Sequence, residues 1–329
     1  MIKTVARVGL PVDEVLAVNK MRLVPTDRGQ REDDLKRISI VTGIHGDELE
    51  GQYVCYKLSS YIQEHLECLT GIVDIYPALN PFGIDSITRG IPAFDLDMNR
   101  IFPGREDGDM NEYIAAKIME DIKGSDLSID IHASNMFLTE VPQIRINEIH
   151  RDMLMPFAME ANVDFVWVHG NSTVLESTFA HSLNNLDTPT IVVEMGIGMR
   201  ITKRYGDQLI DGILHLMEQM GIFKLPQGKE ITVRKPIVST GSNDVCFLNA
   251  PASGIFVANV AHDTYVSKGD NIGEIINPLS GRVIADIQAP ETGWVFTIRE
   301  YPTVNEGSLM GRILKEFVYK SEQSLEVEA

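Results

Sequence analysis

The feature that most constrains the fold is a buried strand that turns directly into a helix. The apolar run at residues 38–42 predicts a buried strand, and residues 49–66 carry apolar side chains at helical spacing. His45 and Glu48 lie in the turn between them. Open α/β sheets bind their ligands at the carboxyl ends of strands. The stretch therefore predicts an α/β fold with a candidate site at this turn.

His45 and Glu48 are residue types that bind zinc, and a catalytic zinc usually has three protein ligands and one open position. The pair also has a structural explanation, in which His45 caps the helix and Glu48 is solvated near its positive end. The metal hypothesis therefore requires a third ligand, a base and substrate-binding groups elsewhere in the chain.

Composition excludes several classes of function. At 329 residues the chain is long enough for two domains. Its hydrophobic content of 44% and charged content of 23% are ordinary for a globular protein. The net charge of −18 and the lack of a basic stripe argue against nucleic acid as a partner. We expect no signal peptide and no membrane span, because no long apolar segment occurs.

The three cysteines, Cys55, Cys68 and Cys246, are odd in number and show no Cys-x-x-Cys spacing. A disulfide framework is therefore not expected, and a reducing cytoplasm is the default location. Cys55 and Cys68 fall within a helical pattern and are most simply core residues.

A candidate third ligand closes another predicted strand, at residues 127–132. His132 ends this strand just as the first motif follows one, and two strand ends of one sheet can bring distant residues together. Asp130 lies on the same face of the strand as His132. It is either a group that supports the metal site from behind or a strand-end carboxylate bonded to backbone.

A long segment from residue 77 to residue 104, predicted to be a loop, carries candidate substrate-binding groups. Arg89 and Arg100 are suited to gripping a carboxylate, since the guanidinium fork forms two parallel hydrogen bonds. Asn99 adds a neutral amide donor. The alternative is that Arg100 pairs with Asp95 or Asp97 and only pins the loop.

A candidate base ends the strand predicted at residues 188–194. Glu194 follows a nearly continuous apolar run, so burial is expected to raise its pKa into the range useful for a general base. The other elements expected in this part of the chain are strands at 15–18, 21–24, 71–76 and 163–168 and helices at 112–122, 149–161 and 205–220. A linker at 224–235 then predicts two domains, 1–225 and 232–329.

The last third of the chain contains an internal repeat. Residues 250–256 recur as 289–295, and residues 266–273 recur as 304–311. Short β-rich runs with glycine turns, repeated once, predict a small β-sandwich or barrel. The repeat resembles biotinyl/lipoyl carrier domains, but the turn at 277–281 has no lysine to carry a cofactor. We therefore expect a structural domain that walls the cleft, with Tyr265 or Tyr301 as residues that could reach into it.

The other histidines show no ligand spacing, and each is expected to have an ordinary surface or core role. They are His65, His150, His169, His181, His215 and His262.

Taken together, the motifs occur in an order that resembles the succinylglutamate desuccinylase/aspartoacylase family, a branch of the zinc carboxypeptidase-like fold. The resemblance covers about residues 38–315 and rests on His45-x-x-Glu48, Asn80-Pro81, Arg89, Asp97-x-Asn99-Arg100, Asp130-Ile131-His132 and Val193-Glu194. It implies a mixed central sheet flanked by helices, followed by a C-terminal all-β domain of the barrel-sandwich type.

The resemblance also implies roles for individual residues. His45, Glu48 and His132 would bind one Zn²⁺ per chain, and Glu194 would be the general base and then the acid. Arg89 would polarise the scissile carbonyl. Asn99 and Arg100 would hold the substrate carboxylate. Arg145 and Arg151 are candidates for the arginines that select the substrate, but the sequence aligns neither of them with the family.

The function expected is that of a zinc-dependent deacylase acting on N-acylated amino acids or related small amides. The alternatives are a metallocarboxypeptidase acting on peptide C-termini and a non-catalytic binding protein on the same fold. A base is unnecessary for a binding protein, so Glu194 disfavours the last. The partner expected is a small N-acyl amino acid, and a homo-oligomer is possible. The sequence does not decide the acyl group or the amino acid.

Overall fold

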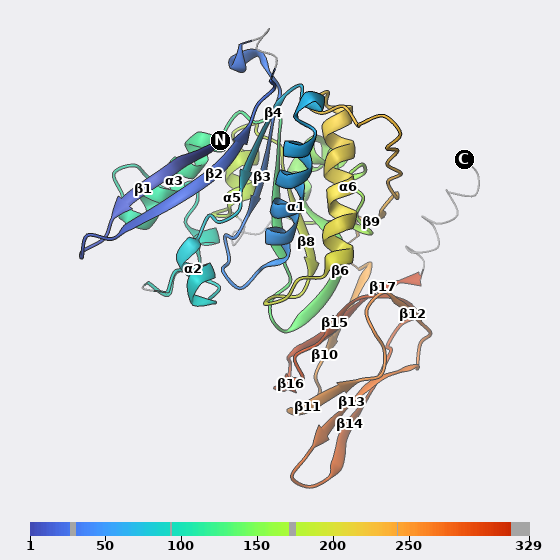
Figure 1. Ribbon diagram of the computed structural model, residues 1–329. Helices are drawn as coiled ribbons and strands as arrows, with labels where there is room; N and C mark the ends of the chain where they lie inside the picture. Colours follow the sequence, from blue (N-terminus) through green and yellow to red (C-terminus); the bar gives the residue numbers. More distant parts are fainter. Residues whose placement is uncertain (27–30, 93, 171–175, 242, 317–329) are drawn as a thin grey trace.

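A computed structural model describes the chain at residues 1–26, 31–92, 94–170, 176–241 and 243–316. Residues 317–329 of the predicted C-terminal domain lie outside the described residues. A mixed α/β body is followed by an all-β C-terminal region (Figure 1). Among the described residues, no helix is both long and apolar enough to cross a membrane.

The body is built on a mixed sheet whose central strands β4, β3, β5 and β8 run parallel. The antiparallel strands β2 and β6 flank these four on either side. The strands of the body are β1 (Ile2–Gly9), β2 (Val15–Leu23), β3 (Arg37–Thr42), β4 (Ile72–Tyr76), β5 (Leu127–Ala133), β6 (Leu138–Asn147), β7 (Phe165–His169), β8 (Thr190–Gly196) and β9 (Ile237–Ser239).

Helices cover both faces of this sheet, with α1 and α6 side by side on one face and α3 and α5 on the other (Figure 1). The helices are α1 (Glu50–Glu64), α2 (Pro81–Ser86), α3 (Met110–Ile122), α4 (Arg151–Ala158), α5 (Phe179–Asn184) and α6 (Lys203–Gln219). Short 3₁₀ turns are η1 (Glu32–Asp34), η2 (Leu66–Cys68), η3 (Met98–Arg100) and η4 (Glu148–His150). The mixed sheet flanked by helices is thus confirmed.

The alternation of side chains along β5 and β8 separates the core from the site. Ile129 and Ile131 of β5, with Ile191 and Val193 of β8, belong to the core that α1 and α6 cover. The residues between them face the opposite side of the sheet, because successive side chains of a strand alternate. That opposite side carries the polar residues of both strands.

Several predicted elements differ from the structure. The runs at 15–18 and 21–24 form one strand, β2, which pairs with β1, a strand that the sequence analysis did not anticipate. The segment 77–104 was expected to be a loop, but it contains α2 and η3. Strand β6 was also missed, although it is ten residues long. Its alternation is obscured by polar residues that are buried inside the molecule.

The C-terminal region is antiparallel and reflects the internal repeat. Its strands are β10 (Val245–Asn249), β11 (Gly254–Ala258), β12 (Thr264–Val266), β13 (Asn271–Asn277), β14 (Arg282–Gln288), β15 (Gly293–Arg299), β16 (Thr303–Val304) and β17 (Leu309–Lys315). A short strand from each half of the repeat pairs with a strand of the other half. Gly254 pairs with Val304, and the equivalent Gly293 pairs with Val266.

The two regions share one sheet. Strand β15 pairs with β6 from Leu138 to Glu140, and β17 continues the sheet beyond β15. Because hydrogen bonds join β6 to β15, the C-terminal strands have a defined position relative to the body. Residues of β17 can therefore reach the polar side of the central strands.

A buried ionic network fastens strand β2 to the central sheet. Asp74 of β4 is fully buried, and its carboxylate accepts two hydrogen bonds from Arg22 at 2.8 Å and one from Lys20 at 3.1 Å. Lys20 is itself only 3% exposed and also pairs with Asp121 of α3 at 2.6 Å. Burial would raise the pKa of Asp74, but these cationic partners outweigh it and lower the pKa.

We predict that Asp74→Ala lowers the free energy of unfolding by about 3–5 kcal/mol, because it removes the buried carboxylate with which both Lys20 and Arg22 pair. Urea denaturation measures the loss. Asp33→Ala is the matched control, since Asp33 forms an exposed pair with Arg31 and its removal should change stability little. An effect no larger than that of the control would contradict the assignment.

The sign of the pH dependence follows from the lowered pKa of Asp74. The stabilisation from this carboxylate is complete above the ordinary Asp pKa of about 3.9 and is lost as the pH falls through the lower folded value. Acid should therefore destabilise the wild-type protein more steeply than Asp74→Ala.

Candidate functional site

A cavity of about 470 Å³ opens on the polar side of strands β5 and β8. It is lined by side chains from both strands, from β6, from α5, from the segment that includes η3, and from β17. The predicted site residues that line it are His45, Glu48, Arg89, Asn99, Arg100, His132 and Glu194. The structure thus brings together groups that are spread over 150 residues of the sequence.

The turn that carries His45 and Glu48 depends on two glycines. Gly43 has φ +71°, a left-handed conformation that favours glycine. A Cβ on Gly46 would lie 1.9 Å from the carbonyl carbon of Gly83, so the turn packs directly on the start of α2. This close contact sets the position of His45 at the end of β3.

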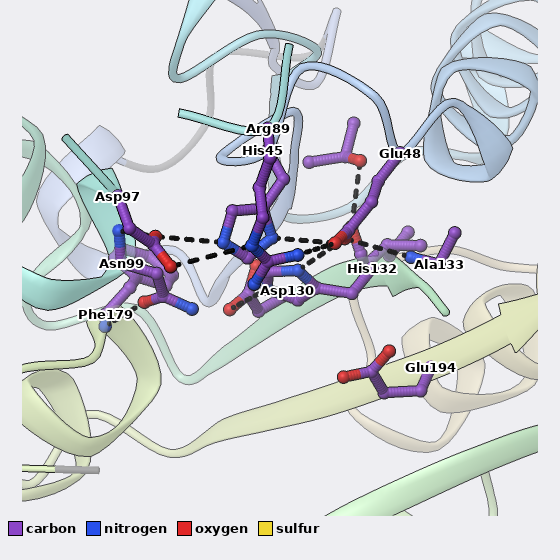
Figure 2. A network of polar contacts seen from close by, with 12 residues as sticks. His45, Glu48, Arg89, Asp97, Asn99, Asp130, His132, Ala133, Phe179 and Glu194 are labelled. Carbon is purple, nitrogen blue, oxygen red and sulfur yellow. Dashed lines mark hydrogen bonds and ion pairs between the residues drawn. The ribbon is translucent and has the colours of Figure 1, made fainter. Parts of the chain in front are cut away.

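His45, Glu48 and His132 form a buried trio. One potential ligand atom of each lies within 4.8 Å of the others, and all three residues are at most 5% exposed. The two oxygens of Glu48 lie 2.8 Å from Nδ1 of His45 and 2.8 Å from Nδ1 of His132 (Figure 2). Both histidines therefore face Glu48 with their Nδ1 atoms.

The opposite ring nitrogens are held by carboxylates. Nε2 of His45 lies 3.1 Å from Asp97, and Nε2 of His132 lies 3.0 Å from Asp130 (Figure 2). In histidines that bind metals, the N–H of the second ring nitrogen usually donates a hydrogen bond to such a carboxylate. This bond fixes the tautomer and raises the basicity of the ring. Of the two explanations for Asp130, the structure supports the one in which Asp130 holds His132 from behind the candidate metal site.

The trio fits a divalent cation on two observations. Nδ1 of His45 is buried and lacks a hydrogen-bond partner among the described residues, although Glu48 is close. In addition, the formal charge of the site is −2 when both imidazoles are neutral. This sum counts the carboxylates of Glu48, Asp97 and Asp130 and the guanidinium of Arg89. A divalent ion would satisfy the nitrogen and balance the charge, so the trio could hold a metal ion.

Without a cation, the charges are balanced by the histidines. Burial would lower the pKa of His132, but Asp130 and Glu48 outweigh it and raise the pKa well above the ordinary value. The pKa of His45 is raised in the same way by Asp97 and Glu48. Burial would raise the pKa of Glu48, but the two histidines lower it. The cluster therefore favours positive charge at its centre.

The structural explanation for the His-x-x-Glu pair is wrong. Helix α1 begins only at Glu50, and its N-cap residue, Leu49, forms no side-chain cap. Glu48 is 4% exposed, so it is not a solvated carboxylate. It also accepts a hydrogen bond from the backbone amide of Ala133, at the end of β5, at 3.2 Å.

The cavity is also lined by Arg89, Asn99 and Arg100. Their contacts differ from the alternative in which Arg100 pairs with an aspartate of its own loop. Arg89 donates to Glu48 at 2.8 Å and lies 3.6 Å from Asp97. Arg100 donates to the backbone oxygen of Asn99, and no ion pair joins it to Asp95 or Asp97 among the described residues. Pinning by Arg100 is therefore not what orders this segment.

Asn99 presents a defined donor. Its side-chain oxygen accepts a hydrogen bond from the backbone amide of Phe179 at 2.8 Å. Since a backbone amide can only donate, this bond assigns the side-chain oxygen and leaves the NH₂ group on the other side. The same bond ties the segment that carries Arg100 to the start of α5.

Glu194 stands apart from the buried trio that could hold a metal ion, on the neighbouring strand (Figure 2). Its backbone pairs with His132 in the parallel register of β5 and β8, so both side chains face the cavity. Burial raises the pKa of Glu194, and the charge of Arg145, 3.4 Å away, opposes that rise. The residue therefore combines access to the cavity with a carboxylate of raised pKa.

The sequence analysis missed a buried carboxylate beside Arg145. Glu140 of β6 is 1% exposed and bonds Arg145 at 2.8 Å and Arg312 of β17. Arg312 also lines the cavity. The position of Arg312 depends on the pairing of β6, β15 and β17, which local sequence patterns cannot reveal.

Of the two arginines proposed as substrate selectors, only Arg145 lines the cavity, and Arg151 is exposed at the start of α4. Neither Tyr265 nor Tyr301 lines it. Arg312 is the residue by which the C-terminal region reaches the site.

Three histidines that were expected to have ordinary roles also line the cavity. His150, His169 and His181 come from η4, the end of β7 and α5. Their separation in sequence follows no ligand spacing, so no local signal distinguished them from His65 or His215.

Comparisons with known proteins agree with this arrangement. The profile of the succinylglutamate desuccinylase/aspartoacylase catalytic domain matches residues 34–220, more than half of the chain. The chain is also 24% identical over 285 residues to the N-alpha-acetyl-L-2,4-diaminobutyric acid deacetylase of Halomonas elongata, covering 82% of this chain and 80% of the relative.

Solved structures share the fold. The product-bound ectoine utilization protein EutE (DoeB) from Ruegeria pomeroyi superposes with a TM-score of 0.76 at 18% identity, over 94% of this chain and 92% of that one. A succinylglutamate desuccinylase/aspartoacylase from Rhodobacter sphaeroides has a TM-score of 0.75 at 20% identity, over 95% of both chains. The family profile, supported by this common fold, shows that the chain belongs to the succinylglutamate desuccinylase/aspartoacylase family.

Proposed function

We propose that this protein is a zinc-dependent deacylase that hydrolyses the amide bond of small N-acylated amino acids. The observation that carries the proposal is the buried trio of His45, Glu48 and His132 facing the same cavity as Glu194. The relatives named as a deacetylase and a desuccinylase support the reaction class.

The trio supplies two imidazoles and one carboxylate, a ligand set typical of catalytic zinc with one position left open. When bound, zinc would act as a Lewis acid on the amide carbonyl and make a water molecule a better nucleophile. Asp97 and Asp130 would orient the two imidazoles through their Nε2 atoms. The set therefore contains both the ligands and the carboxylates that hold them.

Glu194 is proposed as the general base and then the acid. It faces the cavity on the strand beside His132 and is not part of the ligand trio. From this position its carboxylate would take a proton from the attacking water and deliver it to the leaving amine.

The arginines are proposed to bind the substrate. Arg89 lies beside Glu48, where a guanidinium could stabilise negative charge that develops on the carbonyl oxygen. Asn99 and Arg100 would hold the carboxylate of the amino acid, since both line the cavity with donors.

The remaining alternatives are less well supported. A cavity of about 470 Å³ suits a small molecule, whereas a carboxypeptidase requires an open groove for a peptide. We also propose that residues 1–225 form the catalytic domain and that residues 232–329 form a C-terminal β-domain. Its first strand, β9, pairs with β7 of the body, and its repeated part would be a barrel-sandwich that walls the cavity through Arg312.

The first prediction concerns the metal. His132→Ala should lose most of the zinc, about one ion per chain in the wild type, as measured by elemental analysis. Asp130→Asn should retain the ligands but bind zinc about 10–100-fold more weakly in competition with a chromophoric chelator. His215→Ala is the control, because His215 pairs with Glu160 away from the cavity. Full zinc occupancy in His132→Ala would refute the ligand assignment.

The second prediction concerns the base. Glu194→Gln retains the shape of the side chain and removes its basicity, so kcat should fall by at least about 100-fold. Zinc content and KM should stay near the wild-type values. The exposed Glu218→Gln is the control. If Glu194→Gln lost zinc, Glu194 would be a ligand, and near-normal kcat would make it structural.

The third prediction concerns Arg100. Arg100→Ala should raise KM by about 10–100-fold for substrates with a free carboxylate, which is the value of a charge-assisted hydrogen bond. The matching amides should be affected much less. Arg105→Ala, an exposed arginine five residues further along, is the control. Equal losses on both kinds of substrate would rule out carboxylate binding by Arg100.

A further inference from the structure

The cavity extends along β8 from Glu194, beside the metal trio, towards the start of the strand. Arg145 of β6 pairs with Val192 of β8, and Asn147 and Thr190 lie two residues beyond that pair. Asn147 in turn pairs with His169 of β7. Four residues of strand separate Thr190 from Glu194, a distance of about 13 Å. The cavity therefore has two separate ends.

Helix α5 is fixed over the end near Thr190. Asn184 accepts a hydrogen bond from the backbone amide of Thr190 at 2.7 Å and donates one to its carbonyl at 3.1 Å. His181 lies one helical turn before Asn184, and its ring is 5.3 Å from that of His150. We call this part of the cavity the histidine end, formed by Asn147, His150, His169, His181, Asn184 and Thr190.

Two ring nitrogens at the histidine end lack partners. Nε2 of His150 and Nδ1 of His181 are buried and have no hydrogen-bond partner among the described residues. His181 is only 8% exposed. A buried polar atom without a partner is costly in a folded protein. Both residues line the cavity, so a polar group bound beside them could pair with these nitrogens.

The chemistry of His150 can be assigned further. Burial and the neighbouring His181 lower the pKa of His150, which favours the neutral imidazole. A neutral imidazole has one N–H and one lone pair, so the unpartnered Nε2 needs a hydrogen-bonding partner in either tautomer.

The histidine end differs in charge from the rest of the cavity. Arg89, Arg100 and Arg312 line other parts of it, together with Arg145, which Glu140 and Glu194 neutralise. The residues of the histidine end include no carboxylate, lysine or arginine. Burial also lowers the pKa of His169 and disfavours its charged form. A buried charge without a counter-charge is strongly unfavourable, so this end suits an uncharged group.

We propose that the histidine end is a specificity subsite for an uncharged polar group that forms a hydrogen bond, such as a carboxamide or a hydroxyl, at the far end of the substrate. The inference rests on the proposed deacylase function and narrows its substrate class. The substrate would carry its carboxylate at the arginines and a neutral hydrogen-bonding group at the histidines.

Steady-state kinetics on two matched series tests this subsite in the zinc-loaded protein. One series consists of the N-acetyl derivatives of glutamine, glutamate, lysine and norleucine. The other consists of glycine acylated with adipamoyl, adipoyl, aminohexanoyl or heptanoyl groups. In at least one series, kcat/KM should be at least about tenfold higher for the carboxamide than for the carboxylate, ammonium or alkyl compound.

Variants of His150 connect this preference to the subsite. His150→Leu removes the unpartnered nitrogen and should lower the preference for the carboxamide over the alkyl compound about tenfold. His150→Gln supplies an amide oxygen and should restore part of it. His65→Leu, a change at a histidine outside the cavity, should leave the preference unchanged. Zinc content should be equal in all these proteins.

The possible outcomes separate this inference from the proposed function. Hydrolysis without end-group preference, a preference for carboxylate or ammonium, or a preference that survives His150→Leu would overturn the subsite alone. A second zinc ion that is lost in His150→Leu would make the histidines metal ligands. If no compound is hydrolysed, the deacylase function fails, and calorimetric binding of the same compounds then decides whether the carboxamide preference exists.

Discussion

The carboxylate of Glu48 is surrounded by two imidazoles, a guanidinium and a backbone amide inside the protein, and the site is organised around it. These four partners come from three parts of the chain: the turn after β3, the loop that carries Arg89, and the end of β5. A buried carboxylate is stable only when it is paired. The requirement to satisfy Glu48 therefore brings the ligand-bearing segments together before any metal is considered.

The central strands determine what faces this carboxylate. In the parallel register of β3, β5 and β8, His132 lies beside Glu194, while the apolar residues between the polar ones pack under α1 and α6. A shift of one residue in β8 would place Glu194 in the apolar core and Val193 in the cavity. The hydrophobic core thus fixes the register, and the register places the proposed base beside the proposed ligands.

The C-terminal region is coupled to the cavity by another buried carboxylate. Glu140 bonds Arg145 from its own strand and Arg312 from β17, with Gln143 at 3.0 Å and Thr297 of β15 at 3.3 Å as further donors. Removing either arginine would leave a buried charge with fewer partners. This network gives the C-terminal strands a role in the electrostatics of the cavity as well as in the sheet.

The sequence by itself determined the features that depend on local pattern. The strand–turn–helix at residues 38–66, the alternation of β5, the apolar run before Glu194 and the C-terminal repeat are all short-range signals, and each corresponds to an element of the structure. The order of these motifs was also sufficient to indicate the family. Asp130 was correctly placed on the face of His132, because strand geometry alone requires it.

Only the tertiary structure decided which distant residues share the cavity. Arg312, Glu140 and the histidines at 150, 169 and 181 reach it through pairings of β6 with β7, β8 and β15 and through the fastening of α5 at Thr190. Those contacts join residues far apart in the chain, and a single sequence carries no periodicity that specifies them. The trio of candidate metal ligands was predictable because its residues lie at strand ends, whereas the shape and charge of the rest of the cavity depend on how the whole sheet is assembled.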